Sequence, residues 1–152
     1  MSALTFTLKT SPAQRVDCSP LTADKLADKT TAEIAATTLV VGNQAVRTDE
    51  IFDIQGDDVA NIHFAKASDK LDHIGHAMTT GKITVDANAG AYLGQFMEAG
   101  DITVNGNTGI YTACEMKGGT IKVNGNAGDF LGGARIGYKN GMTGGTVIVT
   151  GN

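Results

Sequence analysis

The sequence predicts an all-β fold in which short parallel strands stack into a β-helix (a β-solenoid) with coils of about 19 residues. Two observations support this prediction. Residues 1–74 contain two of the 20 glycines, whereas residues 75–152 contain the other eighteen. The glycine-rich half also carries a repeat with a period of 19 residues, and a fixed period of about this length is typical of repeat architectures.

The repeat begins at residues 81, 100 and 119, and a fourth copy begins at residue 145 after a seven-residue insertion. Apolar residues recur two positions apart, as expected for a strand with one buried face. Glycine-rich repeats this short leave no room for a stable helix pair. We therefore expect like residues to stack from coil to coil. The expected ladders are Ile83, Ile102, Ile121 and Val147; Val85, Val104, Val123 and Val149; Asn88, Asn107, Asn126 and Asn152; Tyr92, Tyr111 and Phe130; and Met78, Met97, Met116 and Met142.

The first part of the chain has no such period. Residues 4–8 alternate as a strand, and residues 38–41, 51–55 and 61–65 are further strand candidates. Ser19 and Pro20 form a plausible start for a short helix over residues 20–28. We expect a single domain over residues 1–152, with an N-terminal cap and irregular coils over 1–60 and a regular repeat over 61–152 that ends in mid-coil.

Composition excludes several classes of protein. The net charge is −4 and no basic stretch follows a nucleic-acid backbone, which argues against nucleic-acid binding. No apolar run approaches the roughly 18 residues of a membrane span, and the N-terminus lacks a secretory pattern. Cys18 and Cys114 stand far apart, which argues against a disulfide framework or a structural zinc site and favours the cytoplasm.

The sequence offers no convincing catalytic, cofactor-binding or metal-binding constellation. His73-Ile-Gly-His76 spells a nucleotidyl-transfer motif, but we interpret it as a polar corner because the expected βαβ context is missing. As metal ligands, the two histidines have only Asp72 as a nearby third donor. The glycine-rich turns lack the spacing of a phosphate-binding loop. We therefore assign no catalytic residue, no cofactor site and no metal site to this chain.

The seven-residue insertion carries Arg135, Tyr138 and Lys139. Repeat proteins tend to place insertions on one face, often the binding face, and arginine and tyrosine are common interface residues. A simply solvated loop is the alternative, but we predict that residues 133–140 contact another subunit or a shared carrier.

The repeat pattern G-x-I-x-V-x-G-x-x-G-x-[YF]-x-G, followed by Met-x-x-Gly, resembles the GXGXG domain. That domain is shared by the C-terminal part of glutamate synthase and the C subunit of formylmethanofuran dehydrogenase. The segments that favour the dehydrogenase family are Arg15-Val-Asp-Cys-Ser-Pro-Leu21, Gly42-Asn43, Leu71-Asp-His-Ile-Gly75, Gly128-Asp-Phe-Leu-Gly-Gly-Ala134 and Gly141-Met142. Residues 1–8 look closer to the bacterial form, which occurs in the formyltransferase/hydrolase complex.

The resemblance implies a right-handed parallel β-helix with a non-catalytic scaffold role in tetrahydromethanopterin-linked one-carbon metabolism. It implies formyltransferase and amidohydrolase-like subunits as partners, and a methanofuran-type carrier in the complex. The zinc of the hydrolase subunit, or the molybdenum or tungsten pterin of the archaeal dehydrogenase, would be held by other subunits.

Two alternatives remain open at this stage. The chain resembles a β-helix domain of a glutamate-synthase-like amidotransferase less closely, and an independent enzyme on a β-helix is a weaker alternative.

We also expect residues 145–149 to form a strand with one unpaired edge, which would invite self-association at that coil.

Overall fold

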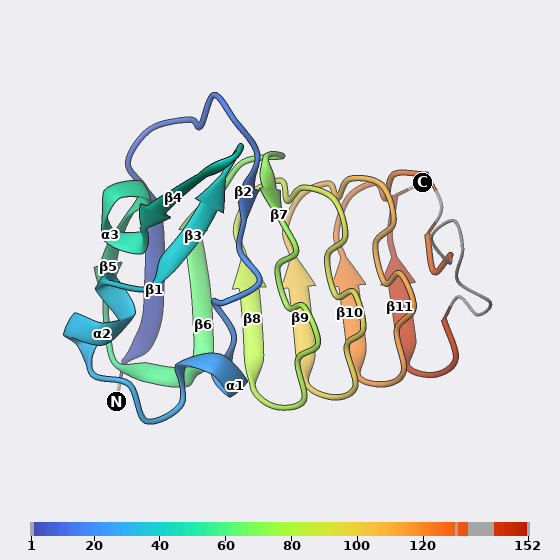
Figure 1. Ribbon diagram of the computed structural model, residues 1–152. Coiled ribbons are helices and arrows are strands. Elements are labelled where there is room, and N and C mark those ends of the chain that lie inside the picture. The colour runs from blue at the N-terminus through green and yellow to red at the C-terminus, as the bar shows by residue number, and fades with distance from the viewer. Residues whose placement is uncertain (1, 130, 134–141, 152) are drawn as a thin grey trace.

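The computed structural model of the protein describes residues 2–129, 131–133 and 142–151 (Figure 1). The strands are β1 (Ala3–Leu8), β2 (Val16–Asp17), β3 (Thr38–Val41), β4 (Gln44–Arg47), β5 (Phe52–Gln55), β6 (Asp58–Lys66), β7 (Leu71–Asp72), β8 (Lys82–Val85), β9 (Asp101–Val104), β10 (Thr120–Val123) and β11 (Thr146–Val149). The helices are α1 (Ala23–Leu26), α2 (Thr31–Ala35) and α3 (Thr48–Ile51). The strands form a seven-stranded sheet in the order β11-β10-β9-β8-β6-β1-β5 and a four-stranded sheet in the order β4-β3-β2-β7.

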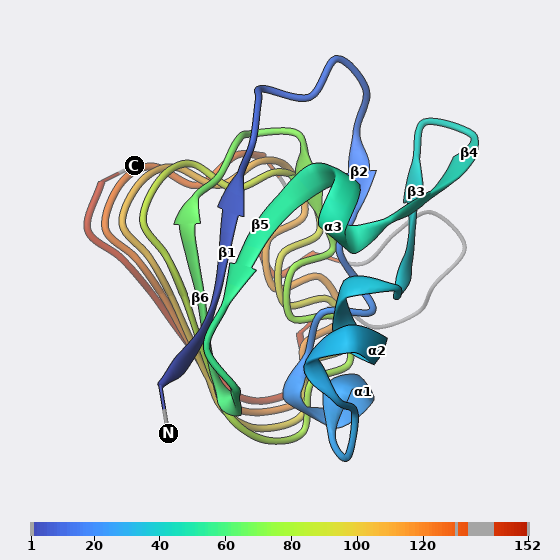
Figure 2. The same ribbon diagram turned by 90° about the vertical axis from the view of Figure 1, so that its left-hand side faces the viewer.

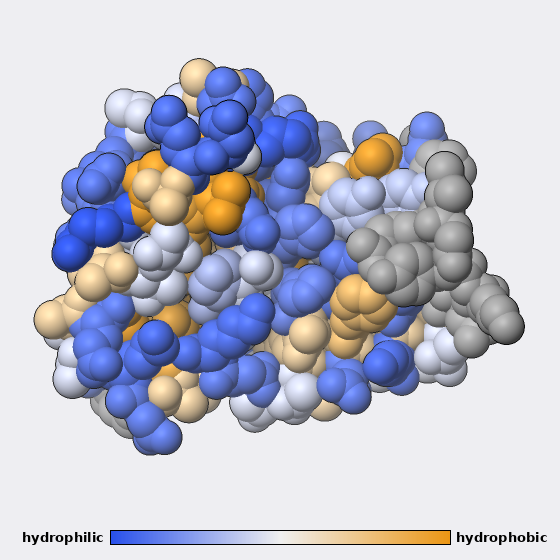
Figure 3. Space-filling view, in the orientation of Figure 1, coloured by the Kyte–Doolittle hydropathy of each residue, from blue (hydrophilic) through white to orange (hydrophobic). Residues whose placement is uncertain are grey.

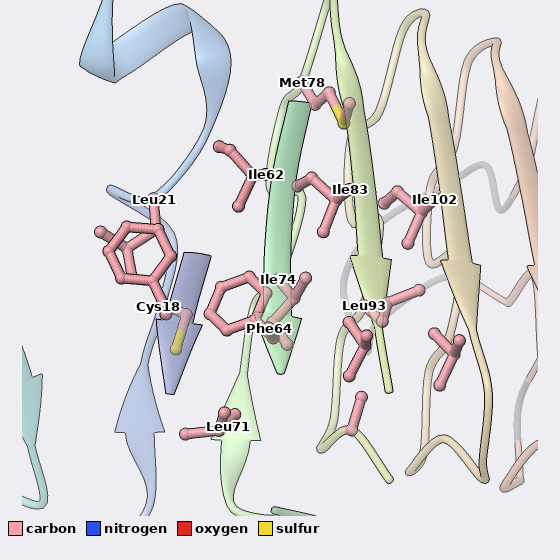
Figure 4. Packing of buried hydrophobic residues seen from close by; sticks show 14 of the residues in the cluster. Cys18, Leu21, Ile62, Phe64, Leu71, Ile74, Met78, Ile83, Leu93 and Ile102 are labelled. Atoms are coloured by element: carbon pink, nitrogen blue, oxygen red, sulfur yellow. The ribbon is translucent and has the colours of Figure 1, made fainter. Parts of the chain in front are cut away.

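The predicted repeat register is confirmed in the large sheet, where β8, β9, β10 and β11 pair in parallel. Ile83 lies opposite Ile102, Ile102 opposite Ile121, and Ile121 opposite Val147. The three isoleucines are almost completely buried, and Figure 4 shows Ile83 and Ile102 stacked beside Ile62 of β6. The insertion before β11 therefore leaves the pairing of the last described strand in register.

The predicted fold class is wrong. The chain is not a right-handed parallel β-helix, because both sheets are mixed: β1 pairs antiparallel with β5 and parallel with β6. In the smaller sheet β3 pairs antiparallel with both β2 and β4, while β2 and β7 are parallel. The physical reason is that the 19-residue period, on which the prediction rested, does not extend over residues 1–66. Strands from this part form the antiparallel pairs β1–β5, β2–β3 and β3–β4, which no stacking pattern predicts.

The N-terminal part of the large sheet is held by an aromatic cluster. The ring centroids of Phe6, Phe52 and Phe64 lie 5.4 to 5.8 Å apart, with one stacked pair and two edge-to-face pairs. All three side chains are buried. In Figure 2, β5, β1 and β6 lie side by side in front of the stacked repeats. This cluster joins the antiparallel β5 to the parallel strands and closes one end of the core.

The predicted helix at residues 20–28 is present in a shorter form. Helix α1 begins after Thr22, whose hydroxyl accepts a hydrogen bond from the Lys25 N–H, and Pro20 lies outside it. Asp24 of this helix accepts a hydrogen bond from the Thr79 N–H at 2.9 Å, which fastens the helix to the turn before β8. Helix α2, which was not predicted, starts with a capping box. No helix among the described residues is long and apolar enough to cross a membrane.

Candidate interaction face

The turns between the strands share an unusual backbone conformation. Three positions in each of three successive turns have a positive φ, and seven of the residues involved are not glycine: His73, Ala77, Tyr92, Phe96, Tyr111, Ala113 and Glu115. A left-handed conformation costs a non-glycine residue roughly 1–2 kcal/mol. Hydrogen bonds between neighbouring turns offset this cost: the His73 N–H donates to the Ala91 carbonyl at 3.0 Å, and the Tyr92 N–H donates to the Ile110 carbonyl at 3.0 Å.

Three rings stack along this face of the turns. The ring centroids of His73 and Tyr92 are 5.0 Å apart with an interplanar angle of 6°, and those of Tyr92 and Tyr111 are 5.3 Å apart with an angle of 2°. The predicted stacking of Tyr92 and Tyr111 is thus confirmed, whereas Phe130 lies outside the described residues. His73 joins the same column, which its position 19 residues before Tyr92 could have indicated. Because the rings cover one another's faces, their edges and the tyrosine hydroxyls are what a partner could contact.

A second column of polar side chains runs beside the rings. Gln95 is only 1% exposed and its Oε1 lies 3.1 Å from Nδ1 of His73. Within the part of the chain that the structure describes, the Gln95 Nε2 and the His76 Nδ1 are buried and have no partner at hydrogen-bond distance. Burial, together with the nearby Lys25 and His73, lowers the pKa of His76, which favours its neutral form at neutral pH. In the next turn the Cys114 Sγ donates to Oε1 of Glu115 at 3.2 Å, and both residues are buried.

Arg15 and Asp72 connect the N-terminal part of the chain to this face. The Arg15 Nε donates to Asp72 Oδ2 at 2.7 Å, and its Nη2 donates to Asp72 Oδ1 at 2.8 Å and to the Asp69 carbonyl at 2.9 Å. Asp72 Oδ1 also accepts the Ala91 N–H at 2.8 Å. The hydrogen bond to Asp72 raises the pKa of Arg15 further. The pair therefore fixes β2, β7 and the following turn relative to one another.

An open groove of about 530 Å³ lies beside this ion pair. It is lined by three charged residues and by residues of the turns around Tyr92 and Ile110. The residues that line it are Arg15, Asp69, Asp72, Ala91, Tyr92, Gly109 and Ile110. Ile110 is 45% exposed, one of the few large apolar side chains in the described part of the chain with that much surface in water. The groove therefore combines an apolar surface with fixed charges.

The asparagine ladders serve mainly to hold the repeats together. The Asn88 Oδ1 accepts the Asn107 N–H, and the Asn107 Oδ1 accepts the Asn126 N–H, each at 2.9 Å. A parallel column joins Asp86 to the Asn105 side chain at 2.9 Å, and His63 pairs with the same carboxylate. Hydrogen bonds from Asn105 and His63 lower the pKa of Asp86. These polar groups are already engaged with their neighbours.

The structure also locates the two histidines that were considered from the sequence. His73 and His76 lie with their ring centroids 5.6 Å apart, and among the described residues no three histidine, cysteine or acidic side chains are placed to bind a metal ion. The predicted partner contacts Arg135, Tyr138 and Lys139 lie outside the described residues. The sequence did not single out the groove, although the segments that hold Arg15 and Asp72 both resemble formylmethanofuran dehydrogenase.

No protein-family model matches the chain. The sequence is 36% identical over 95 residues to the C subunit of the tungsten-containing formylmethanofuran dehydrogenase 2 of Methanococcus maripaludis strain S2. Those residues are 61% of this chain and 35% of the relative. A second such C subunit, also from Methanococcus maripaludis, is 33% identical over 95 residues, with the same coverage. The structure matches a chain from the crystal structure of the formyltransferase/hydrolase complex of Methylorubrum extorquens in complex with methylofuran. The TM-score is 0.92 and the identity 31%.

The resemblance to the C subunit of formylmethanofuran dehydrogenase is confirmed. The structural match covers 97% of this chain and 56% of the Methylorubrum chain. The chain spans about a third of the length of the curated relatives that it matches. Two segments that suggested this family from the sequence, at residues 15–21 and 71–75, lie together in the fold: Val16 pairs with Leu71 and Asp17 with Asp72. Both segments contribute side chains to the groove.

Proposed function

We propose that the chain is a structural subunit of a formyltransferase/hydrolase-type complex in one-carbon metabolism. The observation that supports this most strongly is the structural match along 97% of the chain to a component of such a complex. The match to the archaeal dehydrogenase subunits supports the wider family but covers 61% of the chain. We therefore favour the hydrolase-type arrangement over the dehydrogenase-type one.

In this proposal the chain holds other subunits in place and takes no part in the chemical steps. The polar groups on the candidate interaction face support this role, because Arg15, Asp72, His73 and Asp86 are each bound to another part of the same chain. The formyltransferase and amidohydrolase-like subunits would be the partners. The zinc and the methanofuran-type carrier would be bound by those partners.

Co-expression with the formyltransferase and amidohydrolase-like subunits of the same genome tests the proposal. We expect the tagged chain to purify with both subunits. We also expect the complex to release formate from the formyl carrier, while the isolated chain releases none. Failure of the chain to bind either subunit would refute the proposed complex. Formate release by the chain alone, abolished by a single substitution in it, would refute the non-catalytic role. Purification with a glutaminase or flavin domain would instead favour the amidotransferase alternative.

A further inference from the structure

We propose that the groove beside Tyr92 receives a segment of a partner subunit in which a basic side chain stands next to an aliphatic one. This inference rests on the proposed function and adds to it a location and a chemistry for the contact. Three features of the groove support it: a rigid frame, an unpaired negative charge and an exposed apolar surface.

The frame is rigid because its parts are bonded to one another. Arg15, which directly precedes β2, forms two hydrogen bonds with Asp72 of β7, and the same carboxylate binds the Ala91 N–H of the next turn. Tyr92 is held between two other rings. Contacts that are already in place lower the ordering cost that binding imposes on a surface. The groove is therefore preformed.

The charge of the groove is negative once its internal ion pair is counted. Arg15 and Asp72 neutralise each other at 2.7 Å, which leaves the Asp69 carboxylate. Asp69 is exposed, and its Oδ1 accepts a weak hydrogen bond from the neighbouring Ser68 hydroxyl at 3.4 Å. Within the described ranges no salt bridge reaches its carboxylate, and Arg15, which also interacts with it electrostatically, is one cation against the two carboxylates of Asp69 and Asp72. A lysine or arginine of the partner would complement this charge, which agrees with the net charge of −4 of the whole chain.

The apolar part of the groove comes from the turn that begins at Gly109. Positions 72, 91 and 110 are equivalent in successive repeats and hold aspartate, alanine and isoleucine, so the surface changes from charged to apolar along the stack. Ile110 is 45% exposed. On the face drawn in Figure 3, hydrophobic residues form small separate patches within a mainly hydrophilic surface. An aliphatic side chain placed over Ile110 would remove apolar surface from water while the basic group reached Asp69.

The test uses the complex assembled from co-expressed subunits. Asp69→Lys reverses the unpaired charge, and Asp53→Lys makes the same change at an exposed aspartate of β5 as a matched control. We expect Asp69→Lys to weaken binding of the partner by at least about tenfold, since a favourable charge pair becomes a repulsive one. Ile110→Asn should also weaken binding. Ile148→Asn is its control, because Ile148 is 46% exposed on β11. Binding is measured as the fraction of the tagged chain that retains the partner subunits when the purified complex is diluted in series.

The outcomes separate this inference from the proposed function. If the unmodified chain binds neither subunit, the proposed function fails. If the unmodified chain binds and Asp69→Lys binds equally well, the groove is not the contact. Equal losses in Asp69→Lys and Asp53→Lys would also overturn the inference, because the effect would then be one of net charge. If Asp69→Lys does not fold, Asp69→Asn replaces it in the test, because it keeps the shape of the side chain and removes the charge. Asp69→Asn should also reduce the salt dependence of partner binding.

Discussion

Replacement of Gly94 by alanine should destabilise the protein through one specific collision. A Cβ at Gly94 would lie 2.3 Å from Cδ1 of Ile121. The same distance separates a Cβ at Gly75 from Cδ1 of Ile102 one repeat earlier. In the third turn the equivalent residue is Ala113, at φ +59°, and the equivalent strand residue is Val147, which has no Cδ atom. Alanine thus occurs in this turn position where the neighbouring strand holds valine, and glycine occurs where it holds the larger isoleucine.

The magnitude follows from two contributions. Gly94 has φ +71°, and an alanine held there costs roughly 1–2 kcal/mol. Ile121 is completely buried, so its Cδ1 has no free space to enter, and overpacking of this kind costs typically about 1–3 kcal/mol. Gly94→Ala should therefore lower the free energy of unfolding by about 2–5 kcal/mol. Ile121→Val alone should cost about 0.5–1.5 kcal/mol.

A double-mutant cycle measured by urea unfolding tests this reasoning. In Gly94→Ala/Ile121→Val the collision is absent, so the loss should be smaller than the sum of the two single losses by about 1–3 kcal/mol. Gly132→Ala is a matched control. Gly132 also has a positive φ, but its Cβ would meet no atom of the described residues closer than 3.6 Å, so the backbone cost is the one expected there. Additive losses within about 0.5 kcal/mol would refute the collision, as would equal losses for Gly94→Ala and Gly132→Ala.

Three further predictions follow from the interaction face and the core. Asp72→Asn should lower the free energy of unfolding by about 1–2 kcal/mol, because its hydrogen bonds with the half-exposed Arg15 lose their charge. Arg15→Ala should therefore destabilise the Asp72→Asn variant less than it destabilises the unmodified chain, as measured by urea unfolding. The free energy of unfolding should fall as the pH drops below about 6.5, because the unfolded chain protonates His76 at a higher pH than the folded chain does. His76→Gln should flatten the slope of the free energy of unfolding against pH, and an unchanged slope would contradict this. Cys18 is buried and burial raises the pKa of its thiol, so Cys18 should not react with a disulfide reagent until urea unfolds the chain. Rapid labelling of Cys18 in the native chain would be inconsistent with its burial.

Much of the strand pattern could be predicted from the sequence, because the strands of the repeat bury one face and alternate accordingly. The apolar pairs that begin at Ile83, Ile102 and Ile121 mark strands whose bounds agree closely with β8, β9 and β10. The direction of pairing could not be predicted in the N-terminal part. The alternation of β1 and β5 shows which side chains are buried, but it does not show that the two strands run in opposite directions.

The groove escaped prediction for a related reason. Arg15 and Asp72 are 57 positions apart, and nothing in the local pattern of either segment indicates a contact between them. The short helix α3 and the strand β4 were also missed, because they are held by contacts such as that of the Thr48 N–H with the Thr37 carbonyl rather than by a strong local signal. The aromatic stack was predictable in part, since Tyr92 and Tyr111 share a repeat position, whereas His73 was assigned to a polar corner instead.

The bonds between turns also determine how such a chain can change in length. The Gly94 N–H donates to the carbonyl of Ile74 and the Tyr92 N–H to that of Ile110, so each turn is tied to the turn before and the turn after it. The cross-section therefore does not depend on the number of turns. A duplicated 19-residue unit would meet matching donors, acceptors and isoleucines on both sides. One residue added within a strand would instead turn its buried side chains outward. Duplication of whole units is thus the mutational route by which proteins of this construction can grow while keeping their core.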